Sequence, residues 1–154
     1  MQVEVREPSS ASAGVRIECV GMDRFAEIQA LNREVFGDDR VIFRLDRRDL
    51  TLLLASVEGE PVGFKVGYGE TESTFYSAKG GVLEDFRRRG IAKVLLDRLM
   101  AEARGMGYRR FAYDTFPNKH PGMTHMGLRE GFRVTAAGYN AAYRDYRIRF
   151  EKKL

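Results

Sequence analysis

The sequence contains little cysteine and no long apolar run. Cys19 is its only cysteine, so no disulfide can form within the chain. This residue lies in an alternating apolar and charged segment, which favours a small buried hydrophobe over a nucleophile. No apolar stretch approaches the roughly 18–20 residues that cross a bilayer, and the N-terminus lacks the apolar stretch of a signal peptide. We therefore expect a cytoplasmic protein that does not insert into membranes.

Histidine is also scarce, and the excess of positive charge is small. His120 and His125 are the only histidines, and no cysteine or acidic residue flanks them at the spacing of a metal site. We therefore expect no metal site. The net charge is +4, from 26 basic and 22 acidic residues that are interspersed. This balance suits an anionic ligand such as a nucleotide better than a nucleic acid, for which no binding motif is present.

Length and composition indicate one globular domain, and the order of its predicted strands and helices assigns it to the α/β class. Apolar residues make up 44% of 154 residues, which is ordinary for a folded protein with a single core. Residues 1–13 end in a Pro- and Ser-rich stretch and read as a loose lead-in, so we place the domain at 14–154. Strands are expected at 15–20, 50–57, 62–68, 74–82 and 108–114, with a final hairpin from residue 132 onward.

Three helices are expected between these strands. The first carries apolar residues at helical spacing up to Phe36, with Asp23 as its N-cap and Gly37 at its end. The second begins near Ile91, and the third covers 118–130 although Pro121 interrupts it. Residues 38–48 are mixed in charge and predict a short helix or a loop.

The stretch from Gly80 to Met100 is the most informative part of the chain. It reads as a strand end, a basic turn with one glycine, and a helix whose apolar residues recur every three or four positions. The first amides of a helix have no partner within it, and the helix dipole adds partial positive charge there. Gly90 lets a phosphate approach this backbone closely, and three preceding arginines add full charge. The pattern predicts an anion site, most suited to a pyrophosphate.

This turn is neither a P-loop, since the Gly-Lys-Ser/Thr ending is missing, nor the three-glycine dinucleotide motif. The pattern Val82-x-x-x-Phe86-Arg87-x-x-Gly90-Ile91-Ala92 instead resembles the acyl-CoA signature of the GCN5-related N-acetyltransferases (GNAT). The predicted element order is similar to that family as well. The resemblance implies a mostly antiparallel sheet flanked by helices and splayed between the strands that end near Val82 and Asp114.

The resemblance also implies a set of contacts with acetyl-CoA as cosubstrate. Val82 and Leu83 would offer main-chain groups to pantetheine, and Asn118 would hydrogen-bond to the pantetheine arm. Asn118 also suits a helix N-cap, and the two roles are compatible. The positions matching the pyrophosphate-binding loop are Arg87, Arg88, Arg89, Gly90, Ile91 and Ala92.

The catalytic groups are less clear, because the sequence departs from the family pattern. Many relatives place a tyrosine acid where this chain has Gly127, and a glutamate base at or near Tyr76. Asp114, at a strand end beside the expected gap, is the best candidate base, although it also suits a solvated turn. Weaker candidate bases are Glu70 and Glu72, and the candidate proton donors are Tyr113, His125, Tyr139 and water.

The leading hypothesis is an N-acetyltransferase that moves an acyl group from its CoA thioester directly to a primary amine. The acceptor, a small molecule or a peptide, cannot be read from the sequence. A non-catalytic acyl-CoA-binding module is the alternative, favoured by the missing tyrosine. A nucleic-acid-binding domain is a third and weaker interpretation. Two copies could pair through an exposed edge strand or through the C-terminal strand.

Overall fold

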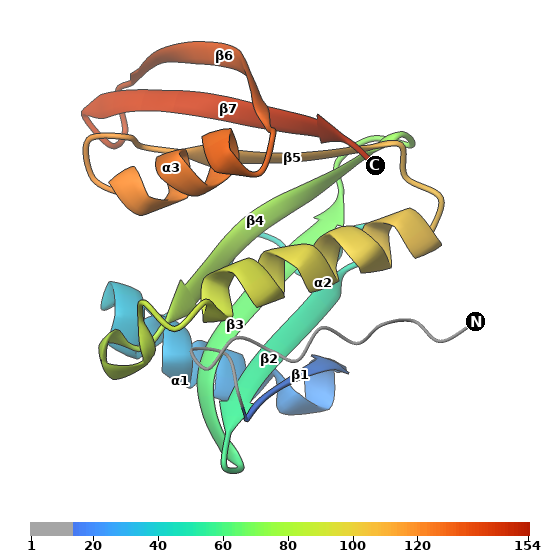
Figure 1. The fold of residues 1–154 in the computed structure, drawn as a ribbon, viewed down its shortest axis with the longest axis vertical. Coiled ribbons are helices and arrows are strands. Elements are labelled where there is room, and N and C mark those ends of the chain that lie inside the picture. The colour runs from blue at the N-terminus through green and yellow to red at the C-terminus, as the bar shows by residue number, and fades with distance from the viewer. Residues whose placement is uncertain (1–13) are drawn as a thin grey trace.

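The computed structural model describes residues 14–154, so the predicted lead-in at 1–13 lies outside the described part (Figure 1). Seven strands form one sheet in the order β1-β2-β3-β4-β5-β7-β6. Their bounds are β1 Val15–Val20, β2 Thr51–Val57, β3 Glu60–Gly69, β4 Thr74–Val82, β5 Arg110–Thr115, β6 Arg133–Asn140 and β7 Asp145–Lys153. The helices are α1 Phe25–Phe36, α2 Ile91–Gly105 and α3 Pro121–Arg129, with single 3-10 turns η1 Met22–Arg24 and η2 Glu84–Phe86.

The sheet lies between two helical layers, as the alternation along β2 shows. Leu52 and Leu54 belong to the apolar cluster that contains Ile28 and Leu31 of α1. Leu53 and Ala55 belong to the cluster that contains the buried side of α2. Because successive strand residues point to opposite faces, α1 and α2 cover opposite faces of the sheet. Figure 1 shows α2 crossing in front of the strands and α3 in front of β5 and β7.

The strands β4 and β5 diverge, which splits the sheet into two parts. All neighbouring strands pair antiparallel except β4 and β5, which pair parallel over three positions, Thr74–Tyr76 with Arg110–Ala112. Beyond Tyr76 the β5 side of β4 has no strand partner, and Figure 1 shows the two strands separating toward the start of α2. The predicted mixed fold and its splay are thus confirmed.

Several local predictions differ from the structure. The first helix begins at Phe25 after a 3-10 turn that includes Asp23, and its N-cap is Arg24 without a side-chain capping bond, so Asp23 is not the cap. The third helix begins only at Pro121, where the proline suits a first helical position because its missing N–H has no helical partner there. Residues 38–48 contain no helix.

Cys19 is exposed, so its predicted burial is wrong. Strand alternation predicts which face a residue takes but not whether anything covers that face. Within residues 14–154, β1 is an outermost strand with β2 as its single strand neighbour, and Cys19 is exposed on this border. In residues 14–154, no helix is both long and apolar enough to cross a membrane.

Candidate active site

The turn before α2 has the backbone shape expected for an anion site. Gly90 is the N-cap of α2 with φ of 76°, a left-handed conformation that glycine adopts without strain. Arg88 also has positive φ, 62°, which sharpens the turn. A Cβ built at Gly90 would find no atom within 4 Å, so this side of the turn is open.

The backbone amides of this turn are free over several consecutive residues. The Val94 amide is the first to donate within the helix, to the carbonyl of Gly90 at 3.1 Å. In the part of the chain that the structure describes, no backbone carbonyl accepts from the amides of residues 88–93. The Arg87 amide differs, because it donates to the Glu84 carbonyl at 3.2 Å. The start of α2 is therefore a row of free donors, as a pyrophosphate site requires.

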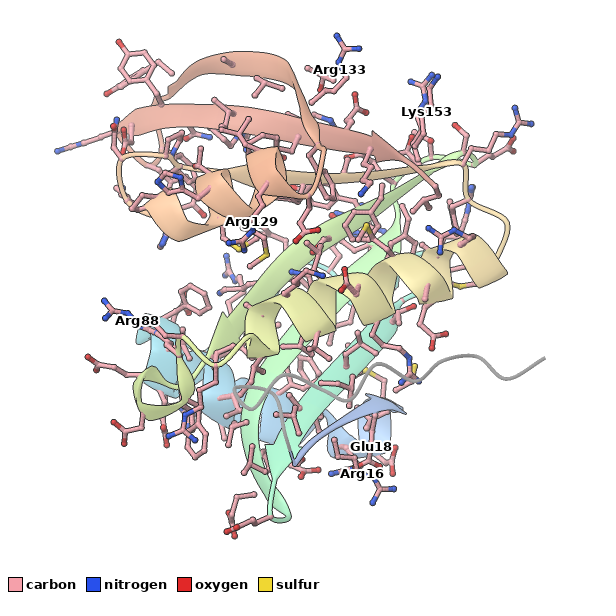
Figure 2. All side chains as sticks on the ribbon, viewed as in Figure 1. Arg16, Glu18, Arg88, Arg129, Arg133 and Lys153 are labelled. Atoms are coloured by element: carbon pink, nitrogen blue, oxygen red, sulfur yellow. The ribbon has the colours of Figure 1, made fainter. Side chains whose placement is uncertain are left out.

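The three arginines of the turn have two different roles. Arg88 and Arg89 are exposed, and Figure 2 shows Arg88 extending from the turn into solvent. The Arg89 guanidinium lies 5.0 Å from the centre of the Phe86 ring. The Arg87 Nε donates to the Val82 carbonyl at 3.0 Å and so ties the turn to the end of β4. No carboxylate of residues 14–154 forms an ion pair with any of the three.

The end of β4 offers backbone groups to the gap between the diverging strands. Leu83 is fully used, since its amide donates to the Val62 carbonyl at 2.8 Å and its carbonyl accepts from Phe86. In antiparallel pairing the backbone groups of successive residues point to opposite sides. Those of Val82 and Gly80 therefore face away from β3, and the Val82 carbonyl accepts from Arg87 as described.

Asn118 lies in the turn between β5 and α3, near the other side of the gap. Its Nδ2 donates to Asp145 Oδ1 at 3.0 Å, and this bond together with the Tyr146 amide lowers the pKa of Asp145. The N-cap of α3 is His120, so the alternative helix-capping role of Asn118 is wrong. Its contact with pantetheine stays a prediction.

Asp114 lies where the strands separate, and it is paired there with Tyr76. The Tyr76 hydroxyl donates to Asp114 Oδ2 at 2.5 Å, across 38 residues of sequence. Burial, and then this bond, raise the pKa of Tyr76 above its usual value, so the phenol keeps its proton. Asp114 is therefore the acceptor in this pair, and its second oxygen accepts no hydrogen bond from residues 14–154.

Arg149 lies directly across from Asp114 on β7 and is held by two other carboxylates. Its Nη1 and Nη2 donate to the two carboxylate oxygens of Glu70 at 3.0 and 2.5 Å, and Nη2 lies 3.6 Å from Glu151 Oε1. The hydrogen bond to Glu70 is the main cause that raises the pKa of Arg149. Glu70 is thus a partner of Arg149 rather than a free base, and Glu72 is exposed in the same turn.

A pocket of about 310 Å³ opens beside Asp114. Asp114 brings a carboxylate, Arg147 and Arg149 bring guanidinium groups, and Tyr139 brings a phenol. Its full lining is Asp114, Ala136, Ala137, Gly138, Tyr139, Asn140, Arg147, Ile148 and Arg149. A second hollow of about 420 Å³, between α1 and the turn, is bordered by three carboxylates, those of Glu34, Glu84 and Asp85, and by one guanidinium, that of Arg87.

The candidate proton donors are dispersed over the structure. Tyr139 lines the Asp114 pocket and is 59% exposed. His125 is exposed on α3. Tyr113 is buried, its hydroxyl donates to the Met123 carbonyl at 2.8 Å, and burial raises its pKa. The structure therefore brings Tyr139 to Asp114 and commits Tyr113 to holding α3.

The packing around α3 explains why position 127 is a glycine. A Cβ at this position would collide with the Tyr113 hydroxyl and lie 3.0 Å from the Phe150 ring. The Tyr113 hydroxyl therefore occupies the space beside α3 into which a side chain at position 127 would point. No sequence pattern pointed to this contact, because the two residues are 14 positions apart.

Residues 22–132 match the model of the Acetyltransferase (GNAT) family, well over half of the chain. The chain belongs to this family. Enzymes of the GNAT family use acetyl-CoA as cosubstrate. No curated protein matches the sequence.

Solved structures of GNAT proteins share the fold. A GNAT family acetyltransferase from Elizabethkingia anophelis with acetyl-CoA bound superposes with a TM-score of 0.76 at 19% identity, covering 92% of this chain and 99% of its own. The IAA acetyltransferase from Bacillus cereus has a TM-score of 0.79 at 19% identity, covering 91% and 99%. The ribosomal-protein-S18-alanine N-acetyltransferase from Escherichia coli gives 0.76 at 11% identity, covering 90% and 93%.

Proposed function

We propose that this GNAT protein is an acetyl-CoA-dependent N-acetyltransferase that moves the acyl group directly to a primary amine. The observation that carries the proposal is the row of amides at residues 88–93 to which residues 14–154 offer no backbone acceptor. These amides lie beside arginines that form no ion pair within the same described range, at the end of an open strand. The E. anophelis structure of the same fold was determined with acetyl-CoA bound. Acetyl-CoA is thus the cosubstrate that the residues of this chain fit.

The pyrophosphate and the pantetheine arm of the cosubstrate each have partners in this proposal. The amides from Arg88 to Ala92 bind the pyrophosphate, with Arg88 and Arg89 adding charge. The pantetheine arm lies along the unpaired edge of β4 and pairs with the backbone at Val82. Arg87 keeps its bond to Val82 and fixes this edge. Asn118 reaches the arm by turning away from Asp145.

Asp114 is the proposed catalytic base. The attacking amine must be neutral, so a carboxylate that takes its proton makes it a nucleophile. The Asp114 oxygen that is not bonded to Tyr76 accepts the proton of the amine, while the Tyr76 hydroxyl holds the other oxygen in place. The amine nitrogen bonds to the thioester carbonyl carbon and the carbon–sulfur bond breaks. The departing thiolate takes a proton from water or from the Tyr139 hydroxyl that lines the same pocket.

The acceptor enters the pocket of about 310 Å³, which has room for a small amine or the end of a peptide. We propose the cytoplasm as the place of action. Pairing of two copies through β6, an edge strand exposed from Arg133 to Tyr139, stays a prediction.

Titration calorimetry with acetyl-CoA and with desulfo-CoA tests the proposal. We expect binding in the micromolar range, and no binding at high-micromolar ligand would overturn the function. Gly90→Glu should abolish binding, because it places a negative charge against the pyrophosphate. Gly90→Gln has the same bulk and the same backbone strain, so it should retain measurable affinity. Equal affinities for the two variants would place the pyrophosphate elsewhere.

The alternative function, a non-catalytic acyl-CoA-binding module, is favoured by one observation. The position of the usual tyrosine is Gly127, and no side chain fits there while the Tyr113 hydroxyl is present. Binding of acetyl-CoA together with background thioester turnover across a broad amine panel would select this alternative.

A further inference from the structure

Lys65 is a buried lysine that the catalytic proposal does not use. Its side chain is 7% exposed, in the middle of β3. Among residues 14–154, no carboxylate, carbonyl or aromatic ring pairs with its ammonium group. Burial alone lowers the pKa of Lys65 to about 8, from 10.5. The Nζ atom is not among the fully buried side-chain atoms that lack a partner, so part of it still meets water, and a ligand carbonyl that reaches it would replace that water.

The face on which Lys65 lies follows from the register of the sheet. Lys65 is directly opposite Leu53 on β2 and opposite Gly80 on β4. Directly opposed residues share a face, and Leu53 belongs to the cluster under α2. Lys65 therefore lies on the α2 side of the sheet, the side on which the free amides of the turn begin the helix.

Gly80 is what lets the ammonium reach the gap between the strands. A Cβ at Gly80 would lie 3.2 Å from Lys65 Nζ and 3.3 Å from its Cγ, so the lysine side chain extends across the glycine. Beyond Gly80 lies the edge of β4 that no strand covers. The Gly80 backbone groups point to this same edge, two residues from the Val82 carbonyl that Arg87 holds. The Lys65 ammonium therefore lies next to the unpaired backbone edge of β4 at Gly80.

We propose that Lys65 is a positioning residue for the cosubstrate. Its Nζ donates a hydrogen bond to an amide carbonyl of the pantetheine arm where the arm passes Gly80. This inference rests on the proposed function and deepens it. The arm is uncharged and rich in amide carbonyls, so a donor that reaches past a glycine can pair with it without competing for the phosphates. The carbonyl supplies the acceptor that the ammonium lacks in the protein alone.

The test measures affinity for three ligands in the full chain and in Lys65→Met. Acetyl-CoA and desulfo-CoA both contain the pantetheine amides, whereas 3′-phospho-ADP contains the pyrophosphate but no arm. We expect Lys65→Met to weaken the binding of acetyl-CoA and of desulfo-CoA by about tenfold, in the range of a hydrogen bond to a charged donor. Binding of 3′-phospho-ADP should be unchanged.

Lys79→Met is the matched control. Lys79 is the residue before Gly80 and its ammonium lies 4.6 Å from the Phe36 ring of α1, on the opposite side of the sheet. This variant removes the same charge and should leave all three affinities unchanged. A second readout is stability: Lys65→Met should unfold at higher urea concentration than the wild type without ligand, while gaining less from added acetyl-CoA.

Each other outcome overturns the inference in a distinct way. Equal affinity of Lys65→Met and wild type for desulfo-CoA would remove Lys65 from the arm. A loss of affinity in Lys65→Met that is confined to acetyl-CoA would show that Lys65 contacts the thioester instead of the arm. An equal loss of affinity for 3′-phospho-ADP would show a general effect on the site. Failure of the wild type to bind acetyl-CoA would overturn the proposed function and this inference together, whereas the other results leave the function standing.

Discussion

At the scale of single residues, the contact between Tyr76 and Asp114 decides how the site can work. The phenol keeps its proton because burial and the carboxylate raise its pKa, so Tyr76 orients Asp114 and does not itself accept a proton. Sequence reasoning found Asp114 from its place at a strand end and noted that Tyr76 is no base. Their pairing joins strands 38 residues apart, and no local pattern shows it.

The first residue-scale prediction concerns proton removal. Asp114→Asn should lower turnover of a good amine acceptor about 100-fold at neutral pH, the usual contribution of a general base, with acetyl-CoA affinity unchanged. The defect should shrink as the pH rises above the pKa of the acceptor amine, because the amine then arrives neutral. Tyr76→Phe serves as a control with a smaller loss. Full turnover in Asp114→Asn at pH 7 would remove Asp114 from the mechanism.

The contacts of Lys65 and Arg149 could not be predicted from the sequence alone. A lysine within the apolar run from Val62 to Val66 was a visible signal, since lysine is rarely buried without a partner. Its target is set by Gly80 on the next strand, which only the register reveals. Arg149 had no signal in the sequence, because alternation places it on a face without telling which carboxylates it meets.

At the scale of elements, α3 is fastened to the sheet by a contact between Tyr113 on β5 and Gly127. The Tyr113 hydroxyl donates to the Met123 carbonyl, and its ring packs edge-on against Phe132 at a centroid distance of 5.2 Å. The absence of a side chain at position 127 is the condition for this packing.

This contact predicts a coupled pair of substitutions. Gly127→Ala should lower the free energy of unfolding by about 1–3 kcal/mol, because the methyl group overpacks the site. Tyr113→Phe should cost about 1 kcal/mol through its lost hydrogen bond. In the double variant the clash with the hydroxyl is gone. Its loss in free energy of unfolding should therefore be about 1 kcal/mol smaller than the sum of the losses of the two single variants. Additive losses in urea unfolding would contradict this packing.

At the scale of the whole molecule, titration of buried groups sets how stability depends on pH. The pKa of Lys65 falls to about 8 in the folded state from 10.5, so the unfolded chain binds more protons between these values and stability rises with pH there. Burial, with a bond to Asp49, raises the pKa of Tyr108 to about 12, and burial raises those of Tyr76 and Tyr113. The folded chain then binds more protons above pH 10, and stability falls.

We therefore expect the free energy of unfolding to rise from about pH 8 to pH 10, by at most about 3 kcal/mol, and to decline above it. Urea unfolding across pH 7–11 measures this profile. Lys65→Met should lose most of the rising limb and keep the decline. Burial also lowers the pKa of Lys79, so Lys79→Met should lose only a smaller part of that limb. A flat wild-type profile between pH 8 and 10 would show that Lys65 is not buried as an unpaired ammonium.

The sequence by itself determined the order of the elements, the anion turn and the family. These follow from local rules: apolar period, glycine at a positive-φ position, and free amides at a helix start. It could not determine where α3 starts, the exposure of Cys19, or the partners of Asn118, Asp114 and Lys65. Those depend on which strands lie side by side and where β4 and β5 part, because contacts across a sheet join residues that local periodicity treats as unrelated.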